Sequence, residues 1–224
     1  MISVIIPTLN EARALPATLA RLAVQDTPHE IIVADGGSGD DTGDVAREAG
    51  ARWLQAPRGR GAQMNAGARQ ARCARGGWLL FLHADTLLPQ GALATIAALP
   101  AQARYGCFHQ AFSGDHRLLR LISRLHNWRC RKTQISYGDQ AMFARRELFE
   151  DLGGFPETEL EDVKISERLR QATPLVFLPA AVVTDARRFL AQGIVRSMGR
   201  IALLLLCHRF KLPLAGRRFF DPVR

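Results

Sequence analysis

Short apolar runs alternate with amphipathic stretches along the first half of the chain. Three of the runs have the length and composition of buried strands, at 2–6, 30–34 and 78–82. Helical patterns lie between them, at about 14–24, 41–49 and 61–75. Continuous apolar strands that alternate with amphipathic helices are typical of a mostly parallel sheet covered by helices on both faces. The pattern therefore predicts an α/β fold.

The second half of the chain has a more mixed pattern. It predicts strands and helices in the order strand 105–112, helix 116–131, strand 140–144, short helix 145–152, helix 161–171 and a long final helix from about 190. We find no internal repeat, low-complexity tract or linker between the two halves. We therefore expect both halves to belong to one fold.

Polar residues follow three of the predicted strands at the point where each strand ends. They form the segments Pro7–Glu11, Asp35–Thr42 and His83–Asp85. In an open parallel sheet, ligands bind at the carboxyl ends of the strands, where the connecting loops collect. These three segments are therefore expected to meet at the ligand-binding edge of the sheet.

The charge of the 224-residue chain is unevenly distributed. Its formal net charge is +9, and the whole excess lies in residues 116–224, partly within apolar sequence. The apolar run 201–207 is much shorter than the ~20 residues needed to span a bilayer. An anionic membrane surface or an acidic lipid-linked acceptor would suit such a basic region, and a solvated basic face is an equal alternative. Nucleic acid binding rests on charge alone and is not expected.

The N-terminus and the cysteines both indicate a cytoplasmic protein. Met1 leads directly into an apolar strand and not into a charged segment followed by an apolar one, so no signal peptide is predicted. The four cysteines lie far apart in the sequence without metal-binding spacing, which favours reduced thiols.

Two glycine-containing segments are candidates for binding a nucleotide. Asp35 stands before two glycines, which permit a tight turn and the close approach of a ligand to the backbone. Its carboxylate could accept hydrogen bonds from a base edge or a ribose. A plain strand-to-helix turn has the same sequence pattern. Arg58 and Arg60 precede a helix that carries Asn65. Two guanidinium groups beside a helix N-terminus could bind a diphosphate, and a basic surface loop is the alternative interpretation. Neither segment matches the dinucleotide-binding or P-loop patterns.

Carboxylates occur at two further places where chemistry is expected. Asp85 follows a buried strand and, with His83 on the same side of an extended segment, could hold Mg²⁺ or Mn²⁺ against phosphate oxygens. A helix cap is the structural alternative. Glu159, Glu161 and Asp162 crowd into four residues before a helix, which raises carboxylate pKa values and could prepare a general base. Acidic residues in a first helical turn are also simply stabilising.

Taken together, these motifs resemble the family 2 inverting glycosyltransferases, which have the GT-A (nucleotide-diphosphosugar transferase) fold. The resemblance covers roughly residues 1–185 and, beyond the segments named above, is carried by Gly138–Phe143, Gly153–Phe155 and Glu161-Asp162. It implies a GT-A domain at 1–185, with a nucleotide-sugar-binding half (1–115) and an acceptor and catalytic-base half (116–185). A basic amphipathic helical extension would follow at 186–224.

The resemblance also implies roles for individual residues. Asp162, with Glu161 beside it, would be the catalytic base, and Asp85 would bind the divalent metal, Mn²⁺ or Mg²⁺. Gly138, Asp139 and Gln140 would shape the acceptor side. The donor, a nucleotide-diphosphate sugar, would be held by Pro7, Thr8, Glu11, Asp35, Gly37, Arg60, Asn65, His83 and Ala84, with Asp35 reading the base and Arg60 near the diphosphate.

The chain departs from the family pattern at two points. His83 replaces the first Asp of the D-x-D motif, so it would contact the ribose or ligate the metal itself. The Q-x-x-R-W motif of processive synthases is missing, and Arg187-Arg188-Phe189 occupies the approximate region, which favours transfer of a single sugar. The acceptor is not identified, but a lipid-like molecule would suit the basic, leucine-rich second half.

Two other functions compete with sugar transfer. A nucleotidyltransferase of similar fold would favour a glycine-rich, basic N-terminal loop, which this chain lacks at 7–11. A protein that binds a nucleotide sugar without turnover would not need both Asp85 and Asp162. A phosphatase of the haloacid dehalogenase type is not expected, because the segment from His83 to Thr86 lacks the leading nucleophilic Asp.

Overall fold

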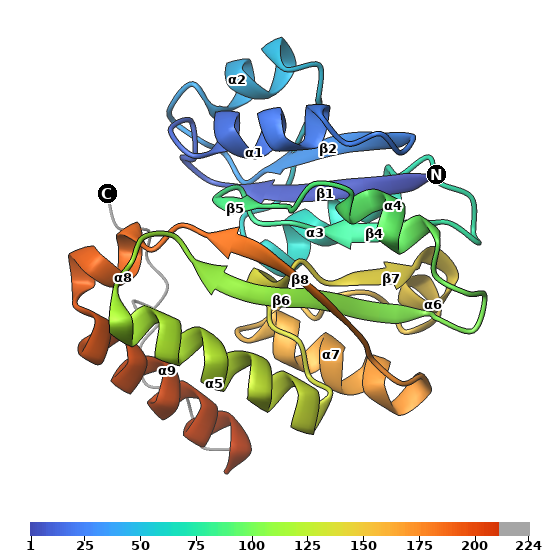
Figure 1. Ribbon diagram of the computed structural model, residues 1–224. Coiled ribbons are helices and arrows are strands. Elements are labelled where there is room, and N and C mark those ends of the chain that lie inside the picture. Colours follow the sequence, from blue (N-terminus) through green and yellow to red (C-terminus); the bar gives the residue numbers. More distant parts are fainter. Residues whose placement is uncertain (211–224) are drawn as a thin grey trace.

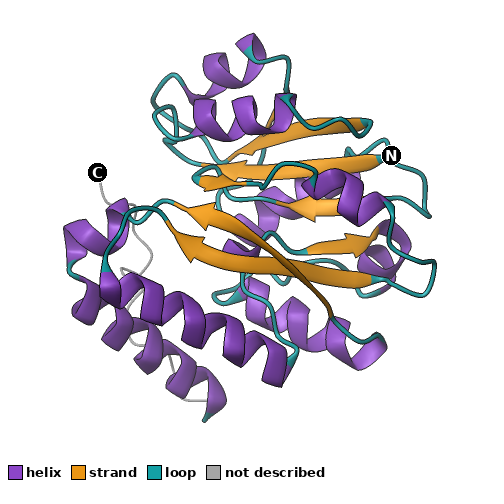
Figure 2. Ribbon diagram, in the orientation of Figure 1, coloured by secondary structure: helices purple, strands orange, loops and turns teal. Residues whose placement is uncertain are grey.

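The computed structural model describes residues 1–210 and contains an eight-stranded sheet with helices on both faces (Figures 1 and 2). The strand order is β3-β2-β1-β4-β7-β6-β8-β5. The first four strands pair in parallel and form one half of the sheet: β1 (Ile2–Thr8), β2 (His29–Asp35), β3 (Arg52–Gln55) and β4 (Trp78–Phe81). The three strands predicted from the first half of the sequence are thus present, and β3 is added at the edge.

The other half of the sheet contains the only reversed strands among the described residues. Its strands are β5 (Thr86–Leu87), β6 (Tyr105–Phe112), β7 (Phe143–Arg145) and β8 (Val176–Thr184). β7 is antiparallel to both β4 and β6, so β6 and its parallel neighbour β8 run in the direction of the first four strands. β5 is antiparallel to β8. The predicted mostly parallel α/β sheet is therefore confirmed.

Alternating side chains of the central strands enter two separate cores. Val4 and Ile6 pack on one face with α1 (Leu15–Ala23), α2 (Thr42–Glu48) and α4 (Ala92–Ala97). Ile5 packs on the other face with α3 (Arg60–Arg69), α6 (Arg146–Asp151) and α7 (Glu161–Ala172). Because β1 is buried on both faces, its residues are apolar almost without interruption, which is why the sequence pattern revealed it.

The remaining helices are α5 (Arg117–Thr133), α8 (Arg187–Gln192) and α9 (Ile194–Arg209). α5 contacts β6, and α8 and α9 follow β8. The predicted final helix is interrupted because Gly193 has a positive φ of 82°, which ends α8. Residues 211–224 of the predicted C-terminal extension lie outside the described residues.

Two predicted boundaries were wrong. α3 ends at Arg69, whereas the pattern extended to 75. After Arg69 the backbone forms turns, in which the N–H groups of Gln70, Ala71 and Gly77 each donate to the carbonyl three residues earlier. The strand predicted at 140–144 begins only at Phe143, because Gly138–Gln140 form a short 3₁₀ helix, η1.

β8 was missed because Pro179 interrupts its pattern, and proline is disfavoured inside a sheet. The structure accommodates Pro179 at an irregularity in the β6–β8 ladder, where the register shifts between Phe108 and His109. The carboxyl end of β8 is the point from which Asp185 and Arg187 reach the candidate site.

Candidate active site

The carboxyl ends of β1 and β2 are joined by the side chains of Thr8 and Asp35. The Thr8 hydroxyl donates to Asp35 Oδ1 over 3.1 Å, and the backbone N–H of Ser38 donates to Asp35 Oδ2 over 3.0 Å. Both Thr8 and Asp35 are buried. The Asp35 carboxylate is therefore held in one orientation at the strand end.

Gln63 on α3 was not predicted, although it supports the same strand ends. Its buried side-chain amide donates to the carbonyl oxygens of Thr8, over 2.6 Å, and of Ala34, over 2.9 Å. A glutamine among small residues at the start of α3 was the only sequence signal. Its position shows that α3 fixes the two neighbouring loops directly.

Glu11 is the buried carboxylate that links the beginning of the chain to the segment after β8. Arg187 donates to Glu11 Oε2 over 2.6 Å, and Arg188 donates to Glu11 Oε1. Burial raises the pKa of Glu11; the Asp85 carboxylate acts in the same direction, and the two arginines act against it. Glu11 and Asp85 are therefore close enough for their charges to interact.

The two arginines were not among the predicted site residues. The sequence contained the signal Arg187-Arg188-Phe189, but nothing in the sequence shows that the end of β8 reaches β1. The connection depends on β5, whose pairing with β8 brings Asp185 next to Asp85, so that the Asp185 N–H donates to the Asp85 carbonyl over 3.0 Å.

Asp162, in the first turn of α7, is oriented by two backbone N–H groups. Gly138 N–H donates to Oδ2 over 2.7 Å, and Val163 N–H donates to Oδ1 over 2.8 Å. A Cβ on Gly138 would lie 2.7 Å from His83 Nε2 and 3.5 Å from Asp162 Oδ2. Gly138 therefore lies between His83 and Asp162, and only a residue without a side chain fits there.

His83 lies among charges of both signs. Burial lowers the pKa of His83, and Arg60 acts in the same direction, while the carboxylates of Asp85, Asp139 and Asp162 oppose this shift. Burial therefore favours the neutral imidazole, which is the form that can bind a metal ion or accept a hydrogen bond.

Glu161, beside Asp162, is paired with Arg60 at the start of α3, with Arg60 Nε 3.6 Å from Glu161 Oε1. Burial is the main reason that the pKa of Glu161 is raised; Arg60 opposes the shift and Asp162 adds to it. The expected like-charge repulsion is thus present but is smaller than the effect of burial.

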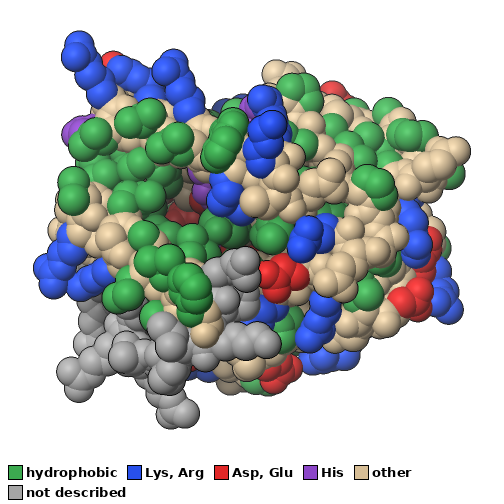
Figure 3. Space-filling view, turned by 90° about the horizontal axis from the view of Figure 1, so that it is seen from below, with side chains coloured by type: hydrophobic (Ala, Val, Ile, Leu, Met, Phe, Trp, Pro, Cys, Tyr) green, Lys and Arg blue, Asp and Glu red, His purple; other side chains and the backbone are tan. Residues whose placement is uncertain are grey.

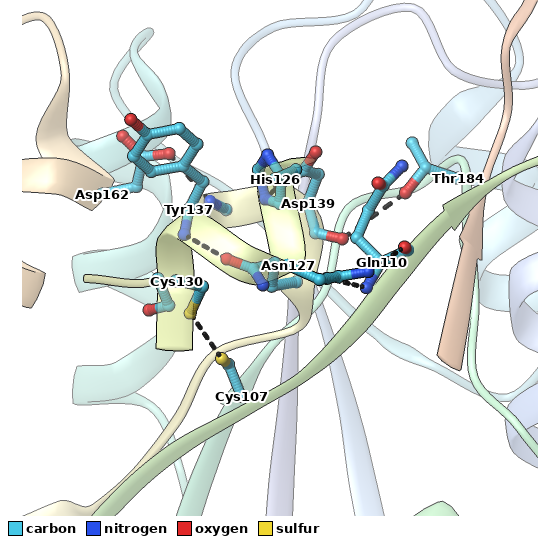
Figure 4. A network of polar contacts seen from close by, with 12 residues as sticks. Cys107, Gln110, His126, Asn127, Cys130, Tyr137, Asp139, Asp162 and Thr184 are labelled. Atoms are coloured by element: carbon cyan, nitrogen blue, oxygen red, sulfur yellow. Dashed lines mark hydrogen bonds and ion pairs between the residues drawn. The ribbon is translucent and has the colours of Figure 1, made fainter. Parts of the chain in front are cut away.

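The acceptor-side residues predicted from the resemblance form η1. The Oδ1 of Asp139 lies 3.4 Å from Nε2 of His126 on α5 (Figure 4). Gln140 is fully buried, and its Oε1 accepts from the Tyr137 N–H. Asn127 exchanges two 2.9 Å hydrogen bonds with the backbone of Gln110 and so ties α5 to β6. η1 is therefore held between α5 and α7.

Two cysteines distant in the sequence also meet beneath η1. The sulfur atoms of Cys107 and Cys130 lie 3.7 Å apart, and both thiols are free and buried (Figure 4). Both lie where α5 packs against β6.

A pocket of about 300 Å³ joins several of these groups. Its polar wall contains Arg60, His83, Asp139, Glu161, Asp162 and Arg188. The C-terminal helices contribute an apolar part of the lining, with Phe189, Ile201, Leu204 and Leu205, beside the polar residues Gln192, Ser197 and Arg200. The structure therefore places the predicted base and the His83 imidazole in one cavity, and it adds an apolar wall that the sequence did not indicate.

Other predicted donor-binding residues lie outside that pocket's lining. Gly37 has a positive φ of 88° in the turn after Asp35, and Ala84 is buried while its carbonyl accepts from Thr18. The Asn65 amide bonds both the N–H and the carbonyl of Phe155, so it ties α3 to the turn before α7. A nucleotide contact from these residues stays a prediction.

The residues present fit a divalent metal that is completed by substrate. Among residues 1–210, no group of three or more His, Cys, Asp or Glu side chains is arranged to hold an ion. Asp85 and neutral His83 would thus supply a partial set, and its completion by phosphate oxygens and water is how Mg²⁺ is usually bound.

Solved structures with the same architecture are GT-A glycosyltransferases. Staphylococcus aureus TarS (residues 1–349) has a TM-score of 0.67 and 19% identity over 89% of this chain and 65% of its own. Mycobacterium tuberculosis glucosyl-3-phosphoglycerate synthase, solved with Mn²⁺, UDP and glucosyl-3-phosphoglycerate, has the same TM-score and identity over 96% and 82%. At 19% identity, this structural similarity establishes only that the chain has the GT-A fold.

Sequence comparison identifies the family. The sequence model of the family described as glycosyl transferase family 2 matches residues 3–153, so the chain belongs to this family of glycosyltransferases. The PGL/p-HBAD biosynthesis glycosyltransferase of Mycobacterium bovis (strain BCG) is 35% identical over 174 residues. That alignment covers 69% of this chain but only 63% of the relative. The chain therefore spans less than two thirds of the length of this curated relative.

Proposed function

We propose that this protein transfers one sugar from a nucleotide-diphosphate sugar to an acceptor hydroxyl with inversion at the anomeric carbon. The observation that carries the proposal is that the oriented Asp162 carboxylate, His83 and three arginines line the same pocket. Solved GT-A neighbours support the donor class, since TarS has been solved with UDP and a Pyrobaculum calidifontis mannosyltransferase with GDP-Man and Mn²⁺.

In the proposed reaction, Asp162 accepts the proton of the acceptor hydroxyl. The acceptor oxygen forms a bond to the anomeric carbon as the bond from that carbon to the diphosphate oxygen breaks, and the nucleotide diphosphate leaves. The guanidinium groups of Arg60, Arg187 and Arg188 would offset the charge that develops on the leaving group. A divalent metal held by Asp85 and His83 would supply further Lewis-acid stabilisation there.

Arg187 and Arg188 have a second role in this proposal. Without a donor they neutralise Glu11, and a diphosphate would compete for the same guanidinium groups. Donor binding would then draw the segment after β8 over the diphosphate. The acceptor would enter on the side of η1 and α9, where apolar residues line the pocket, which suits a lipid-like acceptor at the inner membrane face.

Calorimetric titration with UDP, GDP and CDP, with and without Mn²⁺, tests the donor site. Metal-dependent binding of one of them supports the proposal, and Asp85→Ala should weaken that binding. If a folded protein binds none of them, the proposed transfer is wrong.

Substitution of the base tests the catalytic assignment separately. Asp162→Asn keeps the shape of the side chain but removes its basicity, so transfer should be lost while nucleotide affinity is nearly unchanged. Asp26→Asn, at an exposed aspartate, is the matched control. Unchanged turnover in Asp162→Asn would exclude Asp162 as the base.

A further inference from the structure

α5 has an apolar stripe on the face that points away from the protein. Its buried residues, such as Leu119 and Cys130, lie on the side that contacts β6. The outer stripe has helical spacing and consists of large side chains that are 44–61% exposed: Leu118, Leu121, Leu125 and Trp128. A continuous apolar stripe of this kind is unusual on a surface facing only water.

α9 has the same arrangement. Leu204 and Leu205 line the pocket, while the outward face exposes Val195, Leu203 and Leu206, and Phe210 follows the helix; these four are 53–77% exposed. In Figure 1, α5 and α9 run along the same side of the molecule. Neither the burial of the core nor the lining of the pocket accounts for the two outer stripes.

Both helices carry positive charge without any compensating acid of their own. No Asp or Glu occurs in residues 116–138 or 186–210. On α5, exposed cationic side chains flank the apolar stripe: Arg117, Arg120, Arg124, Arg131 and Lys132. Of these, Arg120 forms an ion pair with Asp115, just before the helix. An amphipathic helix with apolar residues flanked by arginines suits the interface of an anionic bilayer, where each cation contributes about 1 kcal/mol.

The pocket opens on this side of the molecule. The view from below shows a hollow with acidic and histidine side chains at its bottom and hydrophobic side chains around it (Figure 3). Lys and Arg side chains stand around the hydrophobic area in the same view. Within residues 1–210, no helix is long and apolar enough to cross a membrane, so these helices would lie in the plane of the interface.

We propose that the outer faces of α5 and α9 bind the surface of an anionic lipid bilayer and that the pocket mouth opens toward its headgroups. An amphiphilic acceptor could then stay in the bilayer while its hydroxyl enters the pocket and reaches Asp162. The acceptor part of this inference rests on the proposed function, whereas the binding of lipid does not.

Co-sedimentation with vesicles tests the surface. The full chain should bind vesicles of phosphatidylglycerol and phosphatidylcholine, bind phosphatidylcholine alone much more weakly, and dissociate as salt is raised. Leu121→Gln with Leu125→Gln should weaken binding about tenfold or more because two large apolar contacts are lost. Val24→Gln, at a valine that is 58% exposed on α1's C-terminal side, should bind as the wild type does.

The charge contribution is tested in the same way. Arg117→Gln with Arg124→Gln should weaken binding to phosphatidylglycerol vesicles about tenfold, whereas Arg69→Gln with Arg72→Gln, at exposed arginines of another region, should not. Thermal unfolding and nucleotide titration of every variant should match the wild type, since none of these residues lies in the site.

Two results would overturn the inference. One is a wild type that does not distinguish the two vesicle types, because it binds both equally and independently of salt or binds neither. The other is a wild-type dimer in light scattering that the leucine variants dissociate, without any vesicle binding, because a second copy would then cover the stripes. Failure of nucleotide binding with intact vesicle binding would refute the proposed transfer but leave the membrane surface standing.

Discussion

Gly138 lies in the candidate site at a position where the structure leaves no room for a side chain. An added Cβ would lie 2.7 Å from His83 Nε2 and 2.9 Å from its Cε1, whereas ordinary contacts begin at 3.4 Å. One of the groups must therefore move by about 0.7 Å. His83 is enclosed by Gly138 and Asp162 on this side, and overpacking of this kind typically costs about 1–3 kcal/mol.

Chemical denaturation of Gly138→Ala should show this loss of unfolding free energy. In a His83→Ala background the added methyl group has room, so Gly138→Ala should cost little or stabilise by about 0.4–1 kcal/mol through the unfolded chain. The double-mutant cycle should then give a coupling of about 1–3 kcal/mol between the two positions. Turnover should also fall, by up to about 100-fold for a displacement near 1 Å, because the Gly138 N–H orients Asp162.

Gly76→Ala is the matched control for this experiment, because a Cβ at Gly76 would have nothing within 4 Å. Equal stability of Gly138→Ala and Gly76→Ala, with a coupling to His83 below about 0.5 kcal/mol, would refute the reasoning. The His83 ring would then not occupy the space next to the Cα of Gly138.

Three further outcomes are expected. Gly67→Ala places a Cβ 2.5 Å from Ile5 Cγ2 and should lower the unfolding free energy by about 1–3 kcal/mol, which denaturation measures against Gly76→Ala. Arg188→Gln should weaken nucleotide-diphosphate binding about tenfold in calorimetry, as expected when one half-exposed charged hydrogen bond is lost; unchanged affinity would remove it from the donor site. Burial lowers the pKa of His109 below 6.5, so the unfolded state takes up its proton first as the pH falls. Unfolding free energy should therefore decrease from about pH 7 to about pH 5, and His109→Gln should reduce that decrease; an identical pH profile would contradict the shift.

The sequence by itself determined the fold class and the edge at which the site lies. Buried parallel strands need apolar residues on both faces, so β1, β2 and β4 were visible as continuous runs. The turn residues at Asp35 and Asp85 follow these runs directly, and their place at the carboxyl edge required no knowledge of distant contacts. The family resemblance, carried by the order of these motifs, is confirmed by the match over residues 3–153.

Only the tertiary structure decided which distant residues complete the site. The pairing of β5 with β8 brings Arg187 and Arg188 to Glu11, across more than three quarters of the chain. The sequence could not show this, because Pro179 interrupts the strand pattern of β8. In addition, strand pairing is made by backbone hydrogen bonds, which depend little on residue type.

The same limit applies to the close packing around Gly138 and to the apolar pocket wall. A glycine in a sequence indicates freedom of the backbone, but it does not reveal that an imidazole occupies the space of its missing side chain. Similarly, the leucines of α9 read as one apolar run, and only their positions on the folded helix separate Leu204, which faces the pocket, from Leu203, which faces outward. Helix orientation is set by packing against the rest of the molecule, and local sequence cannot specify it.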